Sequence, residues 1–170
     1  MNSEEFRSIQ KPLKEKYREE PASAIVTLKA HGKPGEGVTC RIDTARAVVE
    51  AGLHPATGGT GQFLCSGDML LEALVACAGV TLMAVAASLG VKLKDASITA
   101  EGDIDFRGTL AVSKEAKVGF KDIRLYFFLD TGEEEEKINS LIKLTERYCV
   151  VYQSLKSTPE MKTEYKLTKT

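Results

Sequence analysis

Residues 66–91 read SGDMLLEALVACAGVTLMAVAASLGV, a nearly continuous apolar stretch that decides the fold. Ser66 is expected to cap a long helix, Asp68 suits the positive end of its dipole, and Gly90 is expected to end it. A helix that is apolar on all sides must also be covered on all sides. One small domain covers one side of such a helix. Complete cover therefore calls for a second helix and a sheet, or for a partner subunit.

The same stretch is long enough to span a bilayer. Six of residues 69–91 are alanine, which adds little transfer energy, and the charged side chain of Glu72 is costly in lipid. The sequence therefore favours a buried central helix over a membrane span.

The overall composition bounds the class of protein. The chain has 170 residues with 23 basic and 24 acidic side chains, which is the length of one domain. Its balanced charge argues against nucleic acid as the main partner, because phosphate binding needs a basic excess. The opening residues MNSEE lack the basic and apolar regions of a signal peptide. We therefore expect a cytoplasmic protein with reduced thiols.

The elements around the central helix follow from the spacing of apolar residues. Residues 3–19 and 133–148 are predicted helices, and residues 52–67 are a glycine-rich connector. Strand-like runs occur within residues 23–31, 37–50, 92–106, 118–129 and 161–167, with 45–50 open between strand and helix. This order predicts an α+β protein in which residues 1–21 form a helical extension and residues 22–170 a single domain.

The cysteines offer the clearest candidates for chemistry. They stand at positions 40, 65, 77 and 149, with no CxxC pair and no histidine at metal-motif spacing, so no metal site is expected. Cys40 and Cys65 have no evident chemical role and are expected to be structural. His31 and His54 lie beside glycine or proline in predicted loops, where a solvated side chain is expected.

Cys77 lies in the middle of the long helix. Thr81 and Ser88 share its helical stripe and give the stripe a mildly polar lining, whereas Asp68 and Glu72 fall off it. Most buried free cysteines are inert packing residues, so the position of Cys77 alone favours packing over function.

Cys149 stands where a helix either ends or continues. If the chain breaks at Tyr148, Cys149 caps a new helix, and the helix dipole together with Arg147 would lower the pKa of its thiol. If the helix runs through, Cys149 is a core residue. The local sequence leaves both alternatives open.

Three segments together resemble the OsmC/Ohr family of osmotically inducible and organic hydroperoxide resistance proteins. They are residues 66–77 (SGDMLLEALVAC), 102–110 (GDIDFRGTL) and 146–155 (ERYCVVYQSL). The resemblance covers residues 22–168. It implies an OsmC-like intertwined homodimer, in which two long central helices pack against antiparallel sheets and the site lies at the subunit interface.

The resemblance also implies a cysteine-based peroxidase with a role in the oxidative stress response. Cys77 matches the cysteine that attacks the peroxide and becomes a sulfenic acid, and Cys149 matches the one that then forms a Cys77–Cys149 disulfide. An external dithiol would reopen that disulfide, and no cofactor is expected. Organic hydroperoxides are expected substrates ahead of hydrogen peroxide. Asp68 and Glu72 are the further candidate catalytic residues, since Asp68 matches an acid of the broader OsmC-like branch.

The sequence departs from the family pattern at three positions. Gly67 stands where the hydroperoxide reductases have a glutamate, and Val150 stands where they have a proline. The first predicted turn, residues 29–33, contains no arginine, although Lys29, His31 or Lys33 could substitute. Whether the chain is an enzyme therefore stays open.

Two alternatives to the peroxidase follow from these departures. The first is a non-catalytic dimer that binds a small apolar or thiol-reactive ligand in the interface crevice. The second is a redox sensor in which Cys65 or Cys40 pairs with Cys77.

Overall fold

The computed structural model of the protein describes residues 48–167 without interruption, together with residues 4, 8, 11, 19–20, 27, 31–34 and 39–43. Of the predicted N-terminal helix, the four described residues Glu4, Ser8, Lys11 and Glu19 are helical. The rest of that helix lies outside the described residues, so the extension over residues 1–21 stays a prediction.

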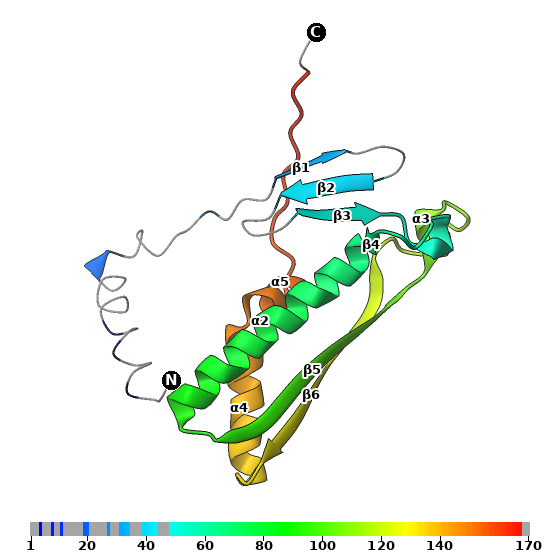
Figure 1. Ribbon diagram of the computed structural model, residues 1–170. Coiled ribbons are helices and arrows are strands. Elements are labelled where there is room, and N and C mark those ends of the chain that lie inside the picture. Colours follow the sequence, from blue (N-terminus) through cyan, green and yellow to red (C-terminus); the bar gives the residue numbers. More distant parts are fainter. Residues whose placement is uncertain are drawn as a thin grey trace.

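The central element is helix α2, Ser66–Leu89, which runs along the whole molecule (Figure 1). The prediction that Ser66 caps the helix is wrong by one residue. Cys65 has the extended backbone of an N-cap, although its side chain makes no capping hydrogen bond, and Ser66 is already helical. Asp68 lies in the first turn as expected. Gly90 ends the helix with a left-handed backbone, φ 65°, and its N–H donates to the carbonyl of Ala86.

A long hairpin covers one side of α2. Strands β5, Leu93–Ile104, and β6, Phe120–Thr131, pair antiparallel with Ile98 opposite Phe127. Their inward apolar residues pack against α2, and short helix α3, Phe106–Thr109, lies in the connection between them. The two predicted strands are therefore confirmed, while the loop between them contains one helical turn that we did not predict.

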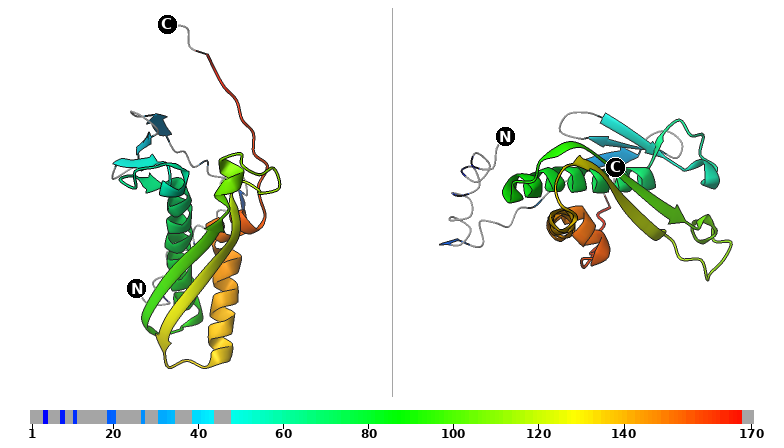
Figure 2. Two further views of the ribbon diagram at one scale, coloured as in Figure 1. Left: turned by 90° about the vertical axis from the view of Figure 1, so that its right-hand side faces the viewer. Right: turned by 90° about the horizontal axis from the view of Figure 1, so that it is seen from below.

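Helix α4, Glu135–Tyr148, runs beside α2, and the hairpin crosses both helices on one side (Figure 2). Two clusters of buried residues result. One cluster is centred on Leu82 and Leu141, and the other consists of Leu74, Ala78 and Cys149. The second cluster lies where α4 gives way to helix α5, Val150–Lys156.

The opposite face of α2 is not covered by the described part of the chain. Val80 is 73% exposed and Met83 is 56% exposed. The helix is long and apolar enough to cross a membrane by length and composition alone. Its other face is buried against β5, α4 and α5, however, as in the core helix of a globular domain. The described part of the chain therefore covers one side of the helix, with a second helix and a sheet, and leaves Val80 and Met83 exposed.

A second sheet adjoins the start of α2, in the order β1-β2-β3-β4. Its strands are β1, His31–Pro34; β2, Thr39–Asp43; β3, Val48–Gly52; and β4, Leu64–Cys65. The antiparallel pairing of β2 with β3 shows that residues 48–50 of the ambiguous run 45–50 belong to a strand, and residues 45–47 lie outside the described residues. Strand β4 pairs parallel with β3 and leads directly into α2.

Between β3 and β4 lies the short 3₁₀ helix η2, Pro55–Thr57, inside the connector. The His54 ring, expected to be solvated, is partly exposed. It stacks on Phe106 with centroids 4.8 Å apart, and its Nδ1 accepts a hydrogen bond from the N–H of Ala56. The Phe106 ring, supplied by α3, covers one face of the imidazole.

The prediction of a last strand over residues 161–167 is wrong. These residues follow α5 as an extended segment that pairs with no described strand and leads away from the body of the molecule (Figure 1). Met161, Tyr165 and Leu167 are all exposed. An alternating sequence becomes a strand only when a neighbouring strand supplies its hydrogen bonds.

Candidate functional site

The structure brings the two family cysteines together from distant parts of the sequence. Cys77 lies half-buried on α2, and Cys149 lies at the junction of α4 and α5 with 1% of its surface exposed. Cys77 packs against the cluster that contains Cys149, and the two free thiols lie within hydrogen-bonding reach of one another. The thiol pair is therefore the core of the candidate site.

A break in the helical backbone creates the position of Cys149. Its φ of −73° and ψ of 108° are extended, so it ends α4 and begins α5. Its N–H still donates to the Thr145 carbonyl at 2.9 Å, and its own carbonyl accepts the N–H of Gln153 at 3.0 Å. Of the two alternatives that the sequence leaves open, the helix break is confirmed. Cys149 is nevertheless also a core residue.

Several donors converge on the Cys77 sulfur. Burial raises the pKa of the Cys77 thiol, but the thiolate is stabilised by the N–H groups of Val151 and Val150, by the Cys149 thiol and by the Thr81 hydroxyl. These donors together outweigh burial, so the pKa of Cys77 lies below its ordinary value. Cys77 is the thiol that ionises more readily, as a nucleophile must.

The surroundings of Cys149 act in the opposite direction. Burial raises the pKa of the Cys149 thiol, and the adjacent Cys77 raises it further, although the N–H groups of Tyr152 and Val151 counteract both effects. The expectation that a helix start lowers the pKa of Cys149 is therefore wrong, because burial and Cys77 outweigh the N–H groups of α5. Of the two thiols, Cys149 is therefore the one that holds its proton more tightly, and its S–H can donate to Cys77 when Cys77 ionises.

The two acidic candidates lie apart from the thiols. Asp68 and Glu72 are exposed on α2, and neither has a polar partner among the described residues. Neither is among the groups that shift the pKa of Cys77. Their catalytic role stays a prediction. Of the candidates to replace the family arginine, Lys29 lies outside the described residues, and His31 and Lys33 are described only as backbone of β1.

Cys65 is too far from Cys77 to pair with it while α2 stays helical. The twelve positions between them correspond to about 18 Å of helix rise, whereas disulfide-bonded residues have Cα atoms within about 7 Å. Cys40 lies on β2 opposite Ala51, and its side chain lies outside the described residues. A Cys65–Cys77 disulfide within one chain would therefore require α2 to unwind.

Sequence reasoning found two of the groups around Cys77, Thr81 from its spacing and Cys149 from the family resemblance, and missed the two backbone N–H groups. Thr81 was visible because it follows Cys77 by one helical turn. The N–H groups of Val150 and Val151 have no signal in the sequence, because they face the sulfur only when the chain breaks at Cys149.

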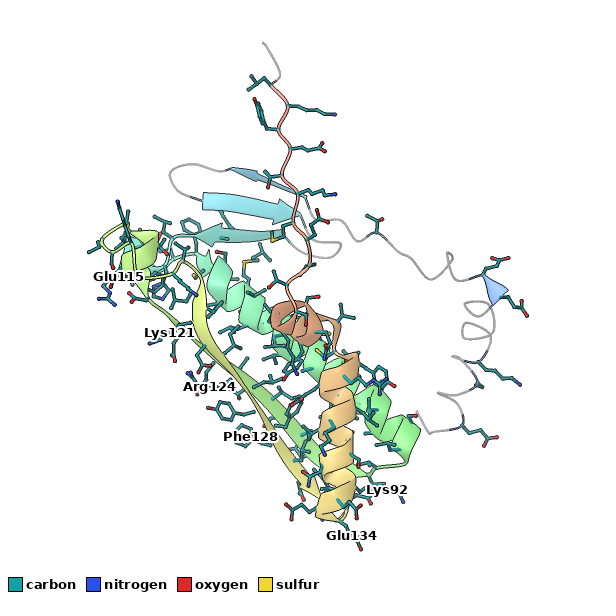
Figure 3. All side chains as sticks on the ribbon, turned by 180° about the vertical axis from the view of Figure 1, so that it is seen from behind. Lys92, Glu115, Lys121, Arg124, Phe128 and Glu134 are labelled. Atoms are coloured by element: carbon teal, nitrogen blue, oxygen red, sulfur yellow. The ribbon has the colours of Figure 1, made fainter. Side chains whose placement is uncertain are left out.

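A second polar cluster lies on the outer face of the hairpin. The guanidinium of Arg124 contacts Asp103 and Asp122 at 2.6 Å each and Glu101 at 3.4 Å. Figure 3 shows Arg124 and Phe128 projecting from β6 on the side away from α4. The hydrogen bonds that Arg124 donates to Asp103 and Asp122 raise the pKa of its guanidinium. One guanidinium is shared by three carboxylates that come from both strands of the hairpin, so the cluster links β5 to β6. No group of three metal-binding side chains occurs anywhere in the described part of the chain.

Comparison with known proteins identifies the family. The family model of OsmC-like proteins matches residues 59–164. No curated protein matches the sequence significantly. Among solved structures, an OsmC-like protein from Mycoplasma pneumoniae aligns with a TM-score of 0.67 at 14% identity, over 78% of this chain and 89% of that one.

Two further structures are named as organic hydroperoxide resistance proteins. The one from Elizabethkingia anophelis has a TM-score of 0.64 at 17% identity and covers 79% of this chain and 91% of its own. The one from Legionella pneumophila has a TM-score of 0.62 at 18% identity and covers 79% and 92%. At these identities the likeness is one of fold, and it matches the predicted α+β architecture. Because the family model spans more than half of the sequence, the chain belongs to the OsmC-like protein family.

Proposed function

We propose that the protein is a thiol-dependent peroxidase that reduces hydroperoxides. The observation that carries the proposal is the pair of adjacent thiols with opposite pKa shifts, lowered at Cys77 and raised at Cys149. Membership of a family whose solved relatives include organic hydroperoxide resistance proteins supports the same activity.

In the proposed first step, the Cys77 thiolate attacks the terminal oxygen of the hydroperoxide. The O–O bond breaks, Cys77 becomes a sulfenic acid, and the alkoxide leaves as an alcohol after taking up a proton. The buried Cys149 thiol lies within reach of that sulfenic acid. Its sulfur displaces water to form a Cys77–Cys149 disulfide, so the peroxide is reduced by two electrons that come from the two thiols.

In the proposed second stage, an external dithiol attacks the disulfide and leaves as a cyclic or intermolecular disulfide, which restores both thiols. The residues packed around the thiols are apolar, among them Leu74, Ala78 and Leu155. This environment suits an organic hydroperoxide better than hydrogen peroxide. No step requires a cofactor.

The proposal includes a homodimer in the cytoplasm. The exposed apolar face of α2, with Val80 and Met83, is the surface on which we expect a second copy to pack. An apolar cleft runs along this face, lined by Val80, Met83, Ala84, Ala87 and Leu93 among others.

The test is consumption of cumene hydroperoxide and hydrogen peroxide by the reduced protein with a small dithiol. Cys77→Ser should abolish turnover, whereas Cys65→Ser, the matched control at the N-cap of the same helix, should retain it. Cys149→Ser should stop after one turnover with a sulfenic acid that dimedone traps at Cys77. Unchanged turnover in Cys77→Ser would exclude the mechanism.

One observation favours a second candidate, a non-catalytic binding dimer. The groups that stabilise the Cys77 thiolate are all uncharged, and Asp68 and Glu72 lie away from it. If neither hydroperoxide is consumed, the expected property is reversible binding of an apolar or thiol-reactive ligand near Cys77, measured by calorimetry on the wild type and on Cys77→Ser.

A further inference from the structure

The junction between α4 and α5 leaves one backbone carbonyl in need of a new partner. In a helix that continued past Tyr148, the carbonyl of Glu146 would accept the N–H of Val150. The break at Cys149 removes that bond. The side chain of Gln153 replaces it, because its Nε2 donates to the Glu146 carbonyl at 2.8 Å. Gln153 belongs to α5, so this bond ties α5 back to the end of α4.

The same replacement determines where the N–H groups of α5 are directed. The first N–H groups of a helix have no partner within it. Those of Val150 and Val151 stabilise the thiolate of Cys77 on the neighbouring helix. If the N–H of Val150 donated to the Glu146 carbonyl, as in a continuous helix, it could not donate to the sulfur of Cys77. The carbonyl and Cys77 therefore compete for one donor, and Gln153 occupies the carbonyl.

Nothing in the covalent chain forces the break at this point. Val150 has an ordinary N–H and can continue a helix, in contrast to proline, which cannot. The extended backbone of Cys149, with ψ 108°, must therefore be held by side chains. Gln153 is the side chain that bonds across the break to a main-chain group of α4.

We propose that Gln153 is a positioning residue of the thiol site: by bonding the Glu146 carbonyl, it holds the α4–α5 break open and keeps the Val150 and Val151 N–H groups directed at Cys77. Its relevance to catalysis rests on the proposed role of Cys77 as the attacking thiol. The positioning itself is a property of the resting protein.

The test measures the pH profile of iodoacetamide alkylation at Cys77 in the reduced full-length protein, with peptide mass spectrometry separating Cys77 from the other cysteines. Gln153→Leu keeps the volume and removes the donor. We expect its profile to move to higher pH, so that alkylation at pH 7 slows about three- to tenfold. Gln153→Lys retains a donor and should recover most of the wild-type rate.

Tyr152→Phe is the matched control. The Tyr152 hydroxyl also contacts Glu146, through the carboxylate, and this contact raises the pKa of Tyr152 after the larger effect of burial. Removing that hydroxyl leaves the Glu146 carbonyl bonded to Gln153. The alkylation profile of Cys77 should therefore stay as in the wild type.

Val150→Pro supplies a second, independent test. Proline is favoured at the first position of a helix, and the backbone of Cys149 lies near the region that precedes proline. Proline would impose the break without Gln153, at the loss of one of the two N–H donors. Gln153→Leu should then shift the profile much less in the Val150→Pro background than in the wild type.

Two results would overturn the proposal: an unchanged profile in folded Gln153→Leu, or an equal shift in both backgrounds. If Gln153→Leu alone does not fold, the double variant Val150→Pro/Gln153→Leu is measured instead. It must fold and show the same alkylation profile as Val150→Pro. Failure on either count also overturns the proposal. No peroxide enters these measurements. A protein that shows the shift but consumes no hydroperoxide would disprove the peroxidase and leave the role of Gln153 standing.

Discussion

At the scale of single residues, two identical thiols acquire different chemistry from their surroundings. Backbone N–H groups and the Thr81 hydroxyl stabilise the thiolate of Cys77. Cys149 is buried in an apolar cluster beside Cys77, which becomes negative when it ionises. When the pair loses one proton, the opposite pKa shifts favour its loss from Cys77 and its retention on Cys149. This division is what a peroxidase needs, because the attacking sulfur must be charged and the resolving one need not be.

Removing the Cys149 thiol should raise the pKa of Cys77. Cys149→Ala deletes one of the donors to the Cys77 thiolate, so we expect the half-point of its alkylation profile to rise by about half to one pH unit. Cys149→Ser keeps a hydroxyl donor and should produce a smaller rise. Identical profiles for the two variants would contradict a donor role for Cys149.

At the scale of elements, the long helix was the most predictable part of the fold. Its apolar run and Gly90 fix its length, and its start was misjudged by one residue. The break at Cys149 could not be chosen from the sequence, because Val150 permits either outcome and the bond from Gln153 spans seven positions. The direction of the Cys149 pKa shift was also beyond sequence reasoning, since it depends on how deeply the α4–α5 junction is buried.

Alanine substitutions at Gly79, inside α2, and at Gly90, which follows its last residue, should change the free energy of unfolding in opposite directions. Gly79 lies inside the helix, where an added Cβ would lie 3.4 Å from Cδ1 of Ile98, an ordinary contact. Gly79→Ala should raise the free energy of unfolding by about 0.5–1 kcal/mol. Gly90 has a φ of 65°, so Gly90→Ala should lower that free energy by about 1 kcal/mol. Urea denaturation monitored by circular dichroism measures both, and shifts of the same sign would contradict this account.

At the scale of the whole molecule, the sequence predicts that complete cover of the central helix needs a second helix and a sheet, or a partner subunit. The structure confirms an apolar face on α2 that the described residues leave exposed, with Val80 at its centre. The failed prediction of a strand over residues 161–167 has the same physical origin. That segment has the alternation of a strand, and the described part of a single chain offers it no edge to pair with.

A charge on this face should break the proposed dimer. Val80→Glu places a carboxylate where the second copy is expected to pack, so we expect a shift from dimer to monomer in light scattering. Val118 is the matched control, because it is also a valine with 73% of its surface exposed but lies in the loop between α3 and β6, away from the exposed face of α2. A dimer that survives Val80→Glu, or that Val118→Glu dissociates equally, would contradict this interface.

The distance in sequence between the two thiols has a consequence for the stability of the chain. If Cys77 and Cys149 join, the chain between them becomes a closed ring of about 70 residues, which loop-closure entropy predicts to stabilise the fold by about 4 kcal/mol. That ring would contain the hairpin, all of α4 and most of the core. The oxidised protein should therefore unfold at a higher urea concentration than the reduced one, with no such difference in Cys77→Ser, and equal midpoints would contradict the ring. In each catalytic cycle of the proposed peroxidase the chain would be linear when reduced and cyclised when oxidised. The resistance of the protein to unfolding would therefore depend on its redox state.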